Sequence, residues 1–399
     1  MYFHTDLFHE PLFTDLVPGR FIRRLNRFVI ECEWGGQAVQ AHLPNPGRLW
    51  ELLVPGRTVT LVKNAASPGR TMPYTAVAVE RDGVTVLLHT TKTNDVVRFL
   101  LASKSIPGLD GAEIVRREFT LGDSRFDFLL QEGGGKILLE VKSCTLYGNS
   151  LAMFPDAVSA RGRRHLEELS AHAQKGCRCG VIFLIHSPRP AFFLPDYHTD
   201  YEFARAFYKH REHLFYRALR VSWREDLRLD EKIEEAVIPW PILEREGHDR
   251  GCYLLLMRLP AATRIAVGAL GTIDFPAGHY LYIGSAQKDL TARLARHLRK
   301  GGKNLHWHVD YLREAADSCR ALPIRTRDDL ECELAAAANR IAAHAVPGFG
   351  ASDCFCPSHL FFLGTLPPLH NQAFLDLVQY YRMDRLFPDP AKEGDIDRY

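Results

Sequence analysis

Residues 20–90 hold five short strand-like runs separated by turns, and so many short strands in so little sequence fit only a few small β folds. The first two runs, 27–33 and 38–43, flank Gly35-Gly36, a signal for a tight hairpin. We therefore predict a small OB-like β-barrel, and any other small β-domain is the alternative. The remaining three runs lie at 58–62, 74–80 and 84–88.

After this β-rich region the pattern changes to a mixture of helices and strands. A helix-like stretch at 94–103 precedes strand-like runs at 125–130 and 136–142. A helix at 160–173 and an apolar strand at 181–185 follow. This β-β-α-β order is typical of an α/β sheet.

The rest of the sequence indicates a further domain beyond a charged stretch. Pro239 and Pro241 lie in a segment rich in Glu, Arg and Asp, which is typical of a linker. Strand-like runs at 252–259 and 279–284 and helix-like stretches at 290–300 and 330–345 follow. We predict a multidomain protein of α+β and α/β class. The predicted boundaries are 1–88 for the barrel, 89–225 for the central domain, 226–250 for the linker, 251–365 for the third domain and 366–399 for a C-terminal tail.

The charge of the chain is nearly balanced, with a formal net charge of +2 and a pI near 8.1. Nucleic-acid binding would therefore depend on local basic clusters rather than on global charge. Two clusters are present, and solvated helix faces are the alternative explanation for each. They comprise Arg161, Arg163, Arg164 and His165, and then Arg293, Arg296, His297, Arg299, Lys300 and Lys303.

Cysteine content and hydropathy favour a cytoplasmic protein. The nine cysteines are an odd number in a long chain, which reduced thiols explain most simply. No run approaches the ~18 apolar residues of a membrane-spanning helix, and the first residues show no basic segment followed by an apolar one.

A candidate metal site lies in the central domain. Asp127 sits in one strand-like run, and Glu140 and Lys142 end the next, thirteen residues on. Alternation along a strand sends Glu140 and Lys142 to the same face, and a glycine turn at 133–135 would let Asp127 join them. Two carboxylates can hold Mg²⁺, which activates a water, while a lysine stabilises the transition state of phosphodiester hydrolysis. An ordinary Glu-x-Lys surface salt bridge is the alternative.

Several motifs resemble the sugar fermentation stimulation protein (SfsA) family, in the same order along about residues 15–225. They are Arg27-Phe28, residues 41–48 (AHLPNPGR), 124–129 (SRFDFL), 140–145 (EVKSCT), 154–157 (FPDA) and 161–166 (RGRRHL). The resemblance implies an OB-like domain followed by a PD-(D/E)xK-type nuclease domain that binds DNA. It also implies that Asp127, Glu140 and Lys142 form the catalytic core.

The chain departs from the family pattern at one point. The family carries a glutamate in the helix before the core strands, and the matching stretch, 94–99, places Arg98 or Phe99 there. Asp95 or Glu118 could substitute as an accessory acid.

A second resemblance covers about residues 250–362. Tyr253 and Tyr282 lie 29 residues apart in strand-like runs, Arg293 follows in a helix, and Glu331 begins a later helix. The ordered set resembles a divergent GIY-YIG nuclease module. It implies that the tyrosines handle the nucleophile, Arg293 pairs with the phosphate and Glu331 holds the metal. Two packed tyrosines beside a solvated arginine are the alternative.

The third domain also departs from its pattern. Ser285 stands where some members carry lysine, and no clear match exists for the asparagine that often follows the glutamate. The domain would therefore either cut DNA or only grip it.

A short cysteine motif near the C-terminal end invites a zinc interpretation. Cys354, Cys356 and His359 could supply three ligands, but the spacing is not that of a standard finger. Buried thiols and a packed histidine are therefore favoured over zinc. The candidates for a fourth ligand are Cys319, Cys332, His306 and His308.

The leading hypothesis is a Mg²⁺- or Mn²⁺-dependent phosphodiesterase acting on DNA or RNA. A non-catalytic DNA-binding regulator is the main alternative, and it predicts salt-sensitive binding that needs no Mg²⁺. A small-molecule enzyme with a fortuitous Asp/Glu/Lys cluster is the third. The residues predicted to contact nucleic acid are Arg125, Arg161, Arg163, Arg164, His165 and His297.

Overall fold

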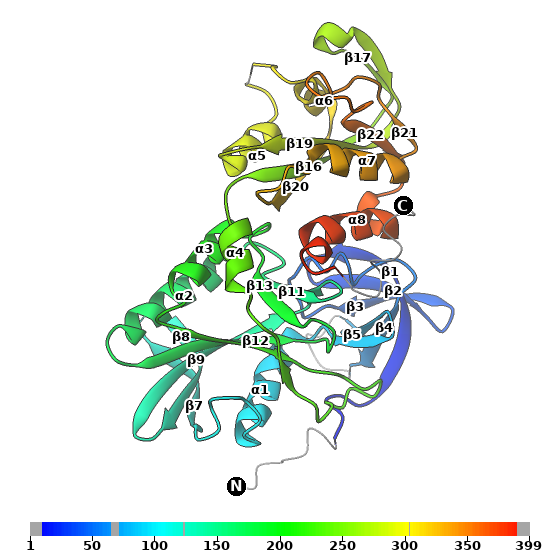
Figure 1. Ribbon diagram of the computed structural model, residues 1–399. Helices are drawn as coiled ribbons and strands as arrows, with labels where there is room; N and C mark the ends of the chain where they lie inside the picture. The colour runs from blue at the N-terminus through cyan, green and yellow to red at the C-terminus, as the bar shows by residue number, and fades with distance from the viewer. Residues whose placement is uncertain (1–9, 65–71, 123, 303, 389–399) are drawn as a thin grey trace. The chain divides into compact units, whose positions relative to one another are not determined.

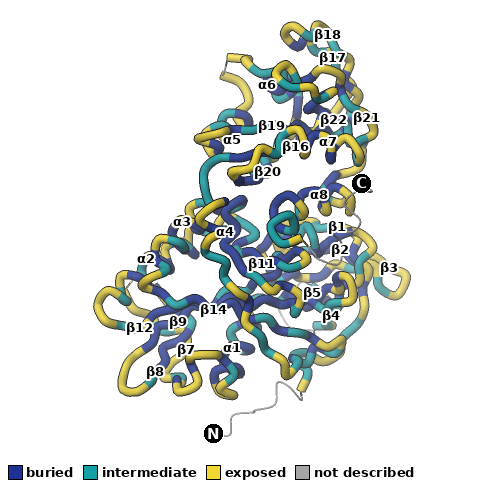
Figure 2. Tube along the Cα trace, in the orientation of Figure 1, coloured by how far each residue is buried: buried dark blue, intermediate teal, exposed yellow. Residues whose placement is uncertain are grey.

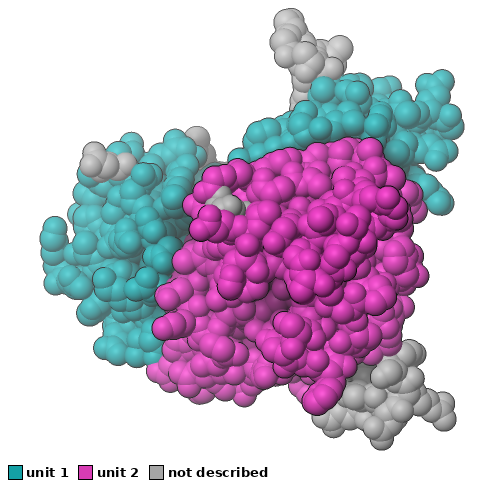
Figure 3. Space-filling view, turned by 90° about the horizontal axis from the view of Figure 1, so that it is seen from above, with its two compact units in different colours: residues 1–196, 202–239, 389–399 teal, residues 197–201, 240–388 magenta. Residues whose placement is uncertain are grey.

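The chain forms two compact units, coloured separately in Figure 3. Unit 1 takes the residues up to Asp196 together with Glu202–Pro239, and unit 2 takes Tyr197–Tyr201 and Trp240–Pro388. The computed structural model, drawn in Figure 1, describes residues 10–64, 72–122, 124–302 and 304–388.

Parts of the predicted organisation fall outside these residues. They are 1–9 and 65–71 of the predicted barrel, Asp123 of the predicted central domain, Lys303 of the second basic cluster and 389–399 of the predicted tail. Among the helices that the structure describes, none is long and apolar enough to cross a membrane.

Unit 1 begins with the predicted OB-like barrel. The strands pair in the order β3-β2-β1-β4-β5, and a parallel pairing of β3 with β5 closes the ring. Strand β6 pairs antiparallel with the end of β5. Gly35 and Gly36 turn the chain between β2 and β3 with φ of +59° and +76°, as a two-residue hairpin turn requires. The strands are β1 (Leu16–Asn26), β2 (Val29–Trp34), β3 (Gln37–His42), β4 (Thr58–Lys63), β5 (Tyr74–Arg81) and β6 (Val84–Leu87).

The sequence pattern did not predict strand β1 of the barrel. Pro18 and Gly19 near its start usually interrupt strands. Only Gly19 and Phe21 of this strand are buried, so it lacks a sustained apolar alternation. The five strand-like runs of the sequence correspond to β2 through β6, and β1, which precedes them, pairs with both β2 and β4 in the barrel.

A six-stranded mixed sheet forms the centre of unit 1, in the order β15-β14-β12-β9-β8-β7. Strands β7, β8 and β9 are antiparallel, and β9, β12 and β14 are parallel. Parallel neighbours need a long crossover, and the connection from β9 to β12 contains α2. The elements are α1 (Thr93–Ala102), β7 (Glu113–Leu121), β8 (Ser124–Glu132), β9 (Gly135–Cys144), α2 (Ala160–Ala173), β12 (Arg178–Ile185), α3 (Tyr201–Lys209), β14 (Phe215–Arg220) and β15 (Glu234–Glu235).

Helices cover both faces of this sheet, whose inner strands are buried (Figure 2). On one face Val96 of α1 packs with Val141 and Ile182. Because side chains alternate along a strand, Phe183 points to the other face, where its ring centroid lies 5.8 Å from that of Phe207 in α3. A small sheet of β10 (Leu146–Tyr147), β11 (Leu151–Phe154) and β13 (Phe192–Pro195) completes the unit.

The predicted linker, 226–250, is a folded part of the chain. Leu227 and Leu229 are fully buried, and Trp223 forms β-bridges to Thr85 and Leu229. The charged residues that suggested a linker lie between these buried apolar residues. Composition alone therefore gave a wrong prediction for this stretch. The boundary between the units falls inside the stretch, where α4 (Trp240–Glu246) begins unit 2.

Unit 2 is built on an antiparallel sheet in the order β20-β16-β19-β22-β21, with a separate hairpin of β17 and β18. Apolar residues from the sheet and from α5 and α6 form its core. The elements are β16 (Gly251–Leu259), β17 (Thr263–Ala266), β18 (Thr272–Phe275), β19 (Gly278–Ala286), α5 (Leu290–Leu298), α6 (His308–Ala315), β20 (Ser318–Arg325), α7 (Glu331–Ile341), β21 (His344–Ala345), β22 (Leu360–Gly364) and α8 (Gln372–Arg382).

The predicted tail, 366–399, contains a packed helix rather than an appendage. Helix α8 buries Phe374, Leu375 and Tyr381, and the Tyr381 hydroxyl donates to Glu333 Oε1 of α7 at 2.9 Å. Its apolar positions follow helical spacing. The third domain therefore extends past residue 365.

Two of the family-like motifs meet in space beside the barrel. Asn45 Oδ1 accepts the Gly47 N–H at 2.9 Å, and Asp156 Oδ2 accepts the Leu49 N–H at 3.4 Å. Arg24 Nη1 donates to the Gly47 carbonyl at 2.6 Å. A Cβ built on Gly47 would lie 2.3 Å from Asp156 Oδ2, so only glycine permits this approach.

We predict that Gly47→Ala lowers the free energy of unfolding by about 1–3 kcal/mol, because its methyl group must displace Asp156 or Asn45. Gly135→Ala is a matched control: Gly135 is not among the positive-φ glycines, and the nearest heavy atom to its Cβ, the Glu132 carbonyl oxygen, is 3.5 Å away. We expect the control to change stability by about 0.5 kcal/mol or less. Urea denaturation measures both, and equal midpoints would contradict the prediction.

Candidate functional site

The hairpin of β8 and β9 brings Asp127 to Glu140 and Lys142. Pairing runs through Phe128↔Leu139, so one further step along the same register places Asp127 opposite Glu140. There the Val141 N–H donates to Asp127 Oδ2 at 2.7 Å. The carboxylate thus takes a donor at the point where the strand pairing ends.

A side chain from α1 fixes the other oxygen of Asp127. Asn94 Nδ2 donates to Asp127 Oδ1 at 2.6 Å. Asp95, the expected accessory acid on this helix, instead pairs with Arg117 at 2.9 Å and Lys92 at 3.6 Å. Glu118 lies on β7 and pairs with Arg125 at 3.6 Å. The α1 group that reaches Asp127 is therefore an amide.

Glu140 is held from two sides through one oxygen. Its Oε1 lies 2.5 Å from Lys142 Nζ and 2.5 Å from His165 Nδ1 of α2. Arg161 Nε donates to His165 Nε2 at 3.3 Å, so that nitrogen accepts and Nδ1 carries the proton donated to Glu140. The carboxylate orientation is therefore fixed by a chain that begins on the helix surface.

The second oxygen of Glu140 is buried and, among the residues that the structure describes, has no hydrogen-bond partner. A buried carboxylate oxygen without a donor is costly, and such an oxygen is usually satisfied by a water or an ion. Asp127 lies on the adjacent strand on the same side. Two carboxylates, one with an unpartnered oxygen, fit a hard divalent cation.

The electrostatics of the two acids differ. Burial, with the negative charge of Glu140, raises the pKa of Asp127 to about 6 from an ordinary 3.8. Burial also acts to raise the pKa of Glu140, but Lys142 and the hydrogen bond from His165 outweigh it, and the pKa is lowered. Glu140 is thus the permanent charge, and Asp127 is the group that an added cation would relieve.

The residues predicted to contact nucleic acid differ in their exposure and in their partners. Arg163 lies 3.7 Å from Glu167, and Arg164 lies 3.7 Å from Glu168, so both are paired with acids on their own helix. His165 is only 2% exposed and contacts Glu140, which excludes the direct nucleic-acid contact expected from its place in a basic run. Arg125 is exposed beside Glu118.

In unit 2 the structure brings the four predicted residues close together. Tyr253 of β16 and Tyr282 of β19 have ring centroids 6.5 Å apart. Arg293 of α5 lies over the Trp307 ring at 4.6 Å, and its charge acts on both the Tyr253 hydroxyl and Glu331. The antiparallel sheet and the two helices thus assemble the set.

The protonation of this second cluster opposes base catalysis by the tyrosines. Burial raises the pKa of Tyr253, and Arg293 opposes that only in part. Burial and the neighbouring Tyr253 also raise the pKa of Tyr282. Glu331 accepts from Ser285 Oγ on one oxygen and lies 3.1 Å from His359 Nδ1 on the other. Both phenols therefore remain neutral donors, and both oxygens of Glu331 are engaged.

His297 is 2% exposed, which corrects its predicted role in nucleic-acid contact. Its Nε2 lies 3.0 Å from the Tyr253 hydroxyl, and its Nδ1 lies 3.7 Å from the buried Asp310. Helical spacing could have predicted that His297 is buried. Leu290, Leu294 and His297 share one apolar face, as Leu166, Leu169 and His165 do in α2.

Three families match parts of the chain. Residues 22–88 match the family described as the SfsA N-terminal OB domain, and residues 91–225 match the sugar fermentation stimulation protein RE domain. Residues 252–379 match a domain of unknown function, DUF123. The first two cover the barrel and central sheet of unit 1, and the third covers most of unit 2.

Whole-protein comparisons give the same picture. The sugar fermentation stimulation protein homologue of Methanothermobacter thermautotrophicus is 40% identical over 188 residues, which is 47% of this chain and 78% of that protein. The homologue of Chloroflexus aurantiacus is 40% identical over 191 residues, 48% of this chain and 73% of its own. The solved structure of Pyrococcus furiosus SfsA in complex with Ca²⁺ is 28% identical, with a TM-score of 0.53 over 57% of this chain and 99% of that one.

We predict that Asp127→Asn stabilises the cation-free protein at pH 8, relative to its effect at pH 4, by up to about 2–3 kcal/mol. An acid whose pKa is raised by folding destabilises the fold wherever it is ionised. The cost is absent below the unfolded pKa of about 4, grows as pH rises, and is complete above the folded pKa of about 6.

Denaturant melts in chelator at pH 4 and pH 8 measure this difference. Glu118→Gln, which neutralises an exposed acid of β7, is the control and should show no comparable gain. A variant at Asp127 that is equally stable to the wild type at both pH values would contradict the burial of a charge there.

Proposed function

This chain belongs to the sugar fermentation stimulation protein family, and from that premise we propose that its central domain is a divalent-cation-dependent nucleic-acid phosphodiesterase of the PD-(D/E)xK type. The observation that carries the proposal is the pair of carboxylates on β8 and β9. Asp127 has a raised pKa, and Glu140 keeps a buried oxygen without a partner among the described residues. An ordinary surface salt bridge needs neither feature.

Asp127 and Glu140 would hold Mg²⁺ or Mn²⁺ through oxygen ligands. Hard divalent cations prefer such ligands, and the family member from Pyrococcus furiosus was solved in complex with Ca²⁺. A bound cation would supply a water of lowered pKa and neutralise charge on the phosphate. The hydrogen bond from Asn94 and the N–H of Val141 fix the Asp127 carboxylate in advance.

The remaining groups have positioning and electrostatic roles. His165 holds Glu140 Oε1, which leaves Oε2 free to face the cation. Lys142 is only 14% exposed at its side chain, and its ammonium group lies beside the same carboxylate. Once a cation takes over part of the Glu140 charge, Lys142 can donate to a phosphate oxygen or to the attacking water.

Nucleic acid is the substrate class that the barrel favours. Phe28 is 47% exposed, and Arg27 lies over its ring with the guanidinium carbon 5.7 Å from the centroid. Exposed aromatic and basic side chains on an OB barrel form stacking platforms for single-stranded nucleic acid. Arg125 and Arg161 supply positive charge near the carboxylates along β8 and α2. DNA and RNA both fit this chemistry.

One observation favours a second candidate, a DNA-binding regulator without turnover. The resemblance implies a carboxylate from the helix before the core strands, and α1 presents the Asn94 amide to Asp127 instead. A site with one fewer acid binds its cation more weakly. Such a protein would bind DNA with strong salt dependence and without a cation requirement.

For unit 2 we propose a nucleic-acid grip rather than a second cutting site. Its GIY-YIG-like set keeps both tyrosines neutral, because burial raises the pKa of Tyr253 and Tyr282. The half-buried Arg293 guanidinium can donate to phosphate oxygens.

We predict that Mg²⁺ or Ca²⁺ stabilises the wild type by about 2.7 kcal/mol at a hundredfold excess over its dissociation constant. Glu140→Gln and Asp127→Asn should lose this increment, because each removes a ligand charge. Glu167→Gln on the exposed face of α2 is the control. Thermal melts with and without the cation measure it, and an increment that survives both variants would remove the proposed cation site.

We predict that Lys142→Met lowers cation-dependent cleavage of labelled DNA or RNA by about 10²–10³-fold. The same variant should bind the cation more tightly, because the competing ammonium beside Glu140 is gone. A purely structural salt bridge would give no such opposite changes. Asp127→Ala that cleaves as well as wild type would exclude the phosphodiesterase, and salt-sensitive DNA binding without any cleavage would favour the regulator.

A further inference from the structure

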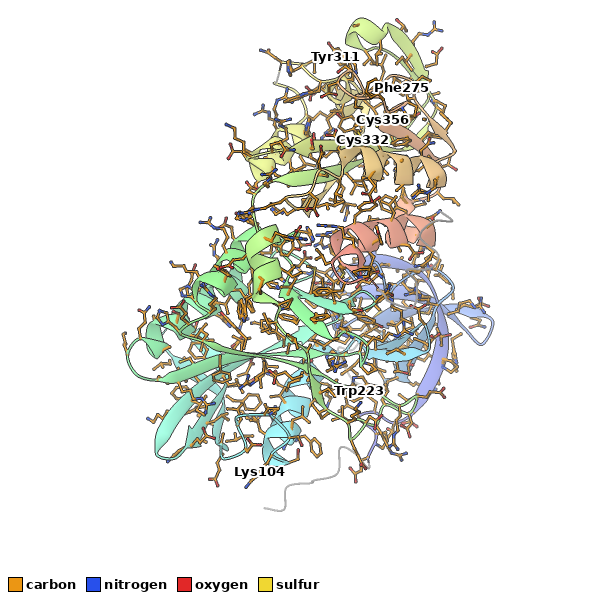
Figure 4. All side chains as sticks on the ribbon, in the orientation of Figure 1. Lys104, Trp223, Phe275, Tyr311, Cys332 and Cys356 are labelled. Carbon is orange, nitrogen blue, oxygen red and sulfur yellow. The ribbon has the colours of Figure 1, made fainter. Side chains whose placement is uncertain are left out.

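Three cysteines and one histidine of unit 2 converge around one point. The ligand atoms of Cys332, Cys354, Cys356 and His359 all lie within 4.8 Å of one another. Cys332 is the second residue of α7, and the others lie in the loop that leads into β22. Figure 4 shows Cys332 and Cys356 side by side near α7. The fourth member is thus Cys332, rather than Cys319, His306 or His308.

We propose that these four side chains form a tetrahedral zinc site of the Cys₃His type. This site is independent of the function proposed for the central domain. Ligands about 2.3 Å (sulfur) and 2.0–2.1 Å (nitrogen) from a zinc ion lie about 3.5–3.8 Å from one another in a tetrahedron. The Cys354 Sγ to His359 Nε2 distance is 3.4 Å, close to that value. A small inward shift of each side chain would complete the coordination.

The histidine is oriented as a metal ligand would be. Its Nε2 faces Cys354, and its Nδ1 lies 3.1 Å from Glu331 Oε1. Ser285 Oγ donates to the other Glu331 oxygen and anchors the carboxylate on β19. Histidine ligands of zinc usually donate their second ring N–H to a carboxylate, which fixes the tautomer and the ring plane. Glu331 is therefore a positioning residue for this site.

The loop holds its two cysteines half-buried beside His359. Gly350 has a φ of +71°, and its N–H donates to His308 Nδ1 at 3.1 Å. The His359 N–H donates to the Phe349 carbonyl at 2.8 Å, and Phe349 is fully buried. Phe355, between the two cysteines, is fully exposed. Cys354 and Cys356 are half-buried, so this loop exposes its phenyl group while it partly covers the two thiols.

The donor set selects the metal. Thiolate and imidazole suit zinc, whereas Mg²⁺ prefers oxygen. Four protein ligands close the coordination sphere, which is the arrangement of a structural rather than a catalytic zinc. Cys332 lies in the first turn of α7. The ion would tie the 346–359 loop to α7, beside Tyr282, which lies under Gly350.

The test uses the full-length chain, purified in a metal-free reductant and loaded with Zn²⁺ or Co²⁺. We expect close to one zinc per chain by elemental analysis. We expect a Co²⁺ form with sulfur-to-metal charge-transfer absorption and the visible bands of tetrahedral geometry. Cys332→Ser and Cys356→Ser should each weaken binding at least tenfold, and Cys319→Ser is the matched cysteine control.

Glu331→Gln separates the site from a merely packed cluster and keeps all four ligands. It should weaken zinc binding by about 10–100-fold while the tetrahedral Co²⁺ spectrum persists. Three outcomes would overturn the proposal. They are a wild type that takes up no zinc under reducing conditions, equal affinity in wild type and Cys332→Ser, and a disulfide among Cys332, Cys354 and Cys356 in freshly isolated protein.

Discussion

The hydrogen bond from the Val141 N–H to Asp127 Oδ2 decides the geometry of the central domain. It ends the pairing of β8 with β9 and seats a carboxylate beside Glu140. Two like charges on neighbouring strands repel, and the repulsion adds to burial in raising the pKa of Asp127. The fold tolerates this because Lys142 and His165 both lie against Glu140. The site therefore stores electrostatic free energy that the binding of a cation would release, and such stored strain is typical of functional sites.

Short-range patterns predicted the parts of the fold that short-range physics determines. Period-two alternation and the turn at Gly133–Gly134, with φ of +54° and +84°, place Glu140, Lys142 and Asp127 on one hairpin. The apolar spacing of α2 gave its bounds, 160–173, without error. The proline and glycine of β1 prevented its prediction as a strand. The charged residues after β14 obscured the buried apolar residues among them. Composition fails where a few apolar contacts hold a mostly polar segment.

The roles of single residues were harder to predict, because they depend on contacts distant in sequence. His165 stands in a basic run, yet helical spacing turns it toward the sheet, and only the sheet supplies Glu140 as its partner. Cys332 and Cys354 are separated by most of α7, β21 and a loop. No spacing rule connects them, since the distance between them is set by the pairing of β21 and β22 and by Gly350. Tertiary structure selects one of the four candidate partners for the cysteine motif.

The two clusters offer different metal ligands within one chain: hard oxygen donors in one and soft sulfur donors in the other. Oxygen donors gather in unit 1, where a lysine and a histidine leave one carboxylate oxygen unpartnered among the described residues. Sulfur donors gather in unit 2, where Glu331 is already bound to His359 and Ser285. A carboxylate that orients a histidine ligand is poorly placed to hold a second, harder ion, because both of its oxygens have partners. Tyr253 and Glu331 are thus engaged by His297 and by His359 and Ser285, and the proposed phosphodiester chemistry depends on the carboxylates of the β8–β9 hairpin.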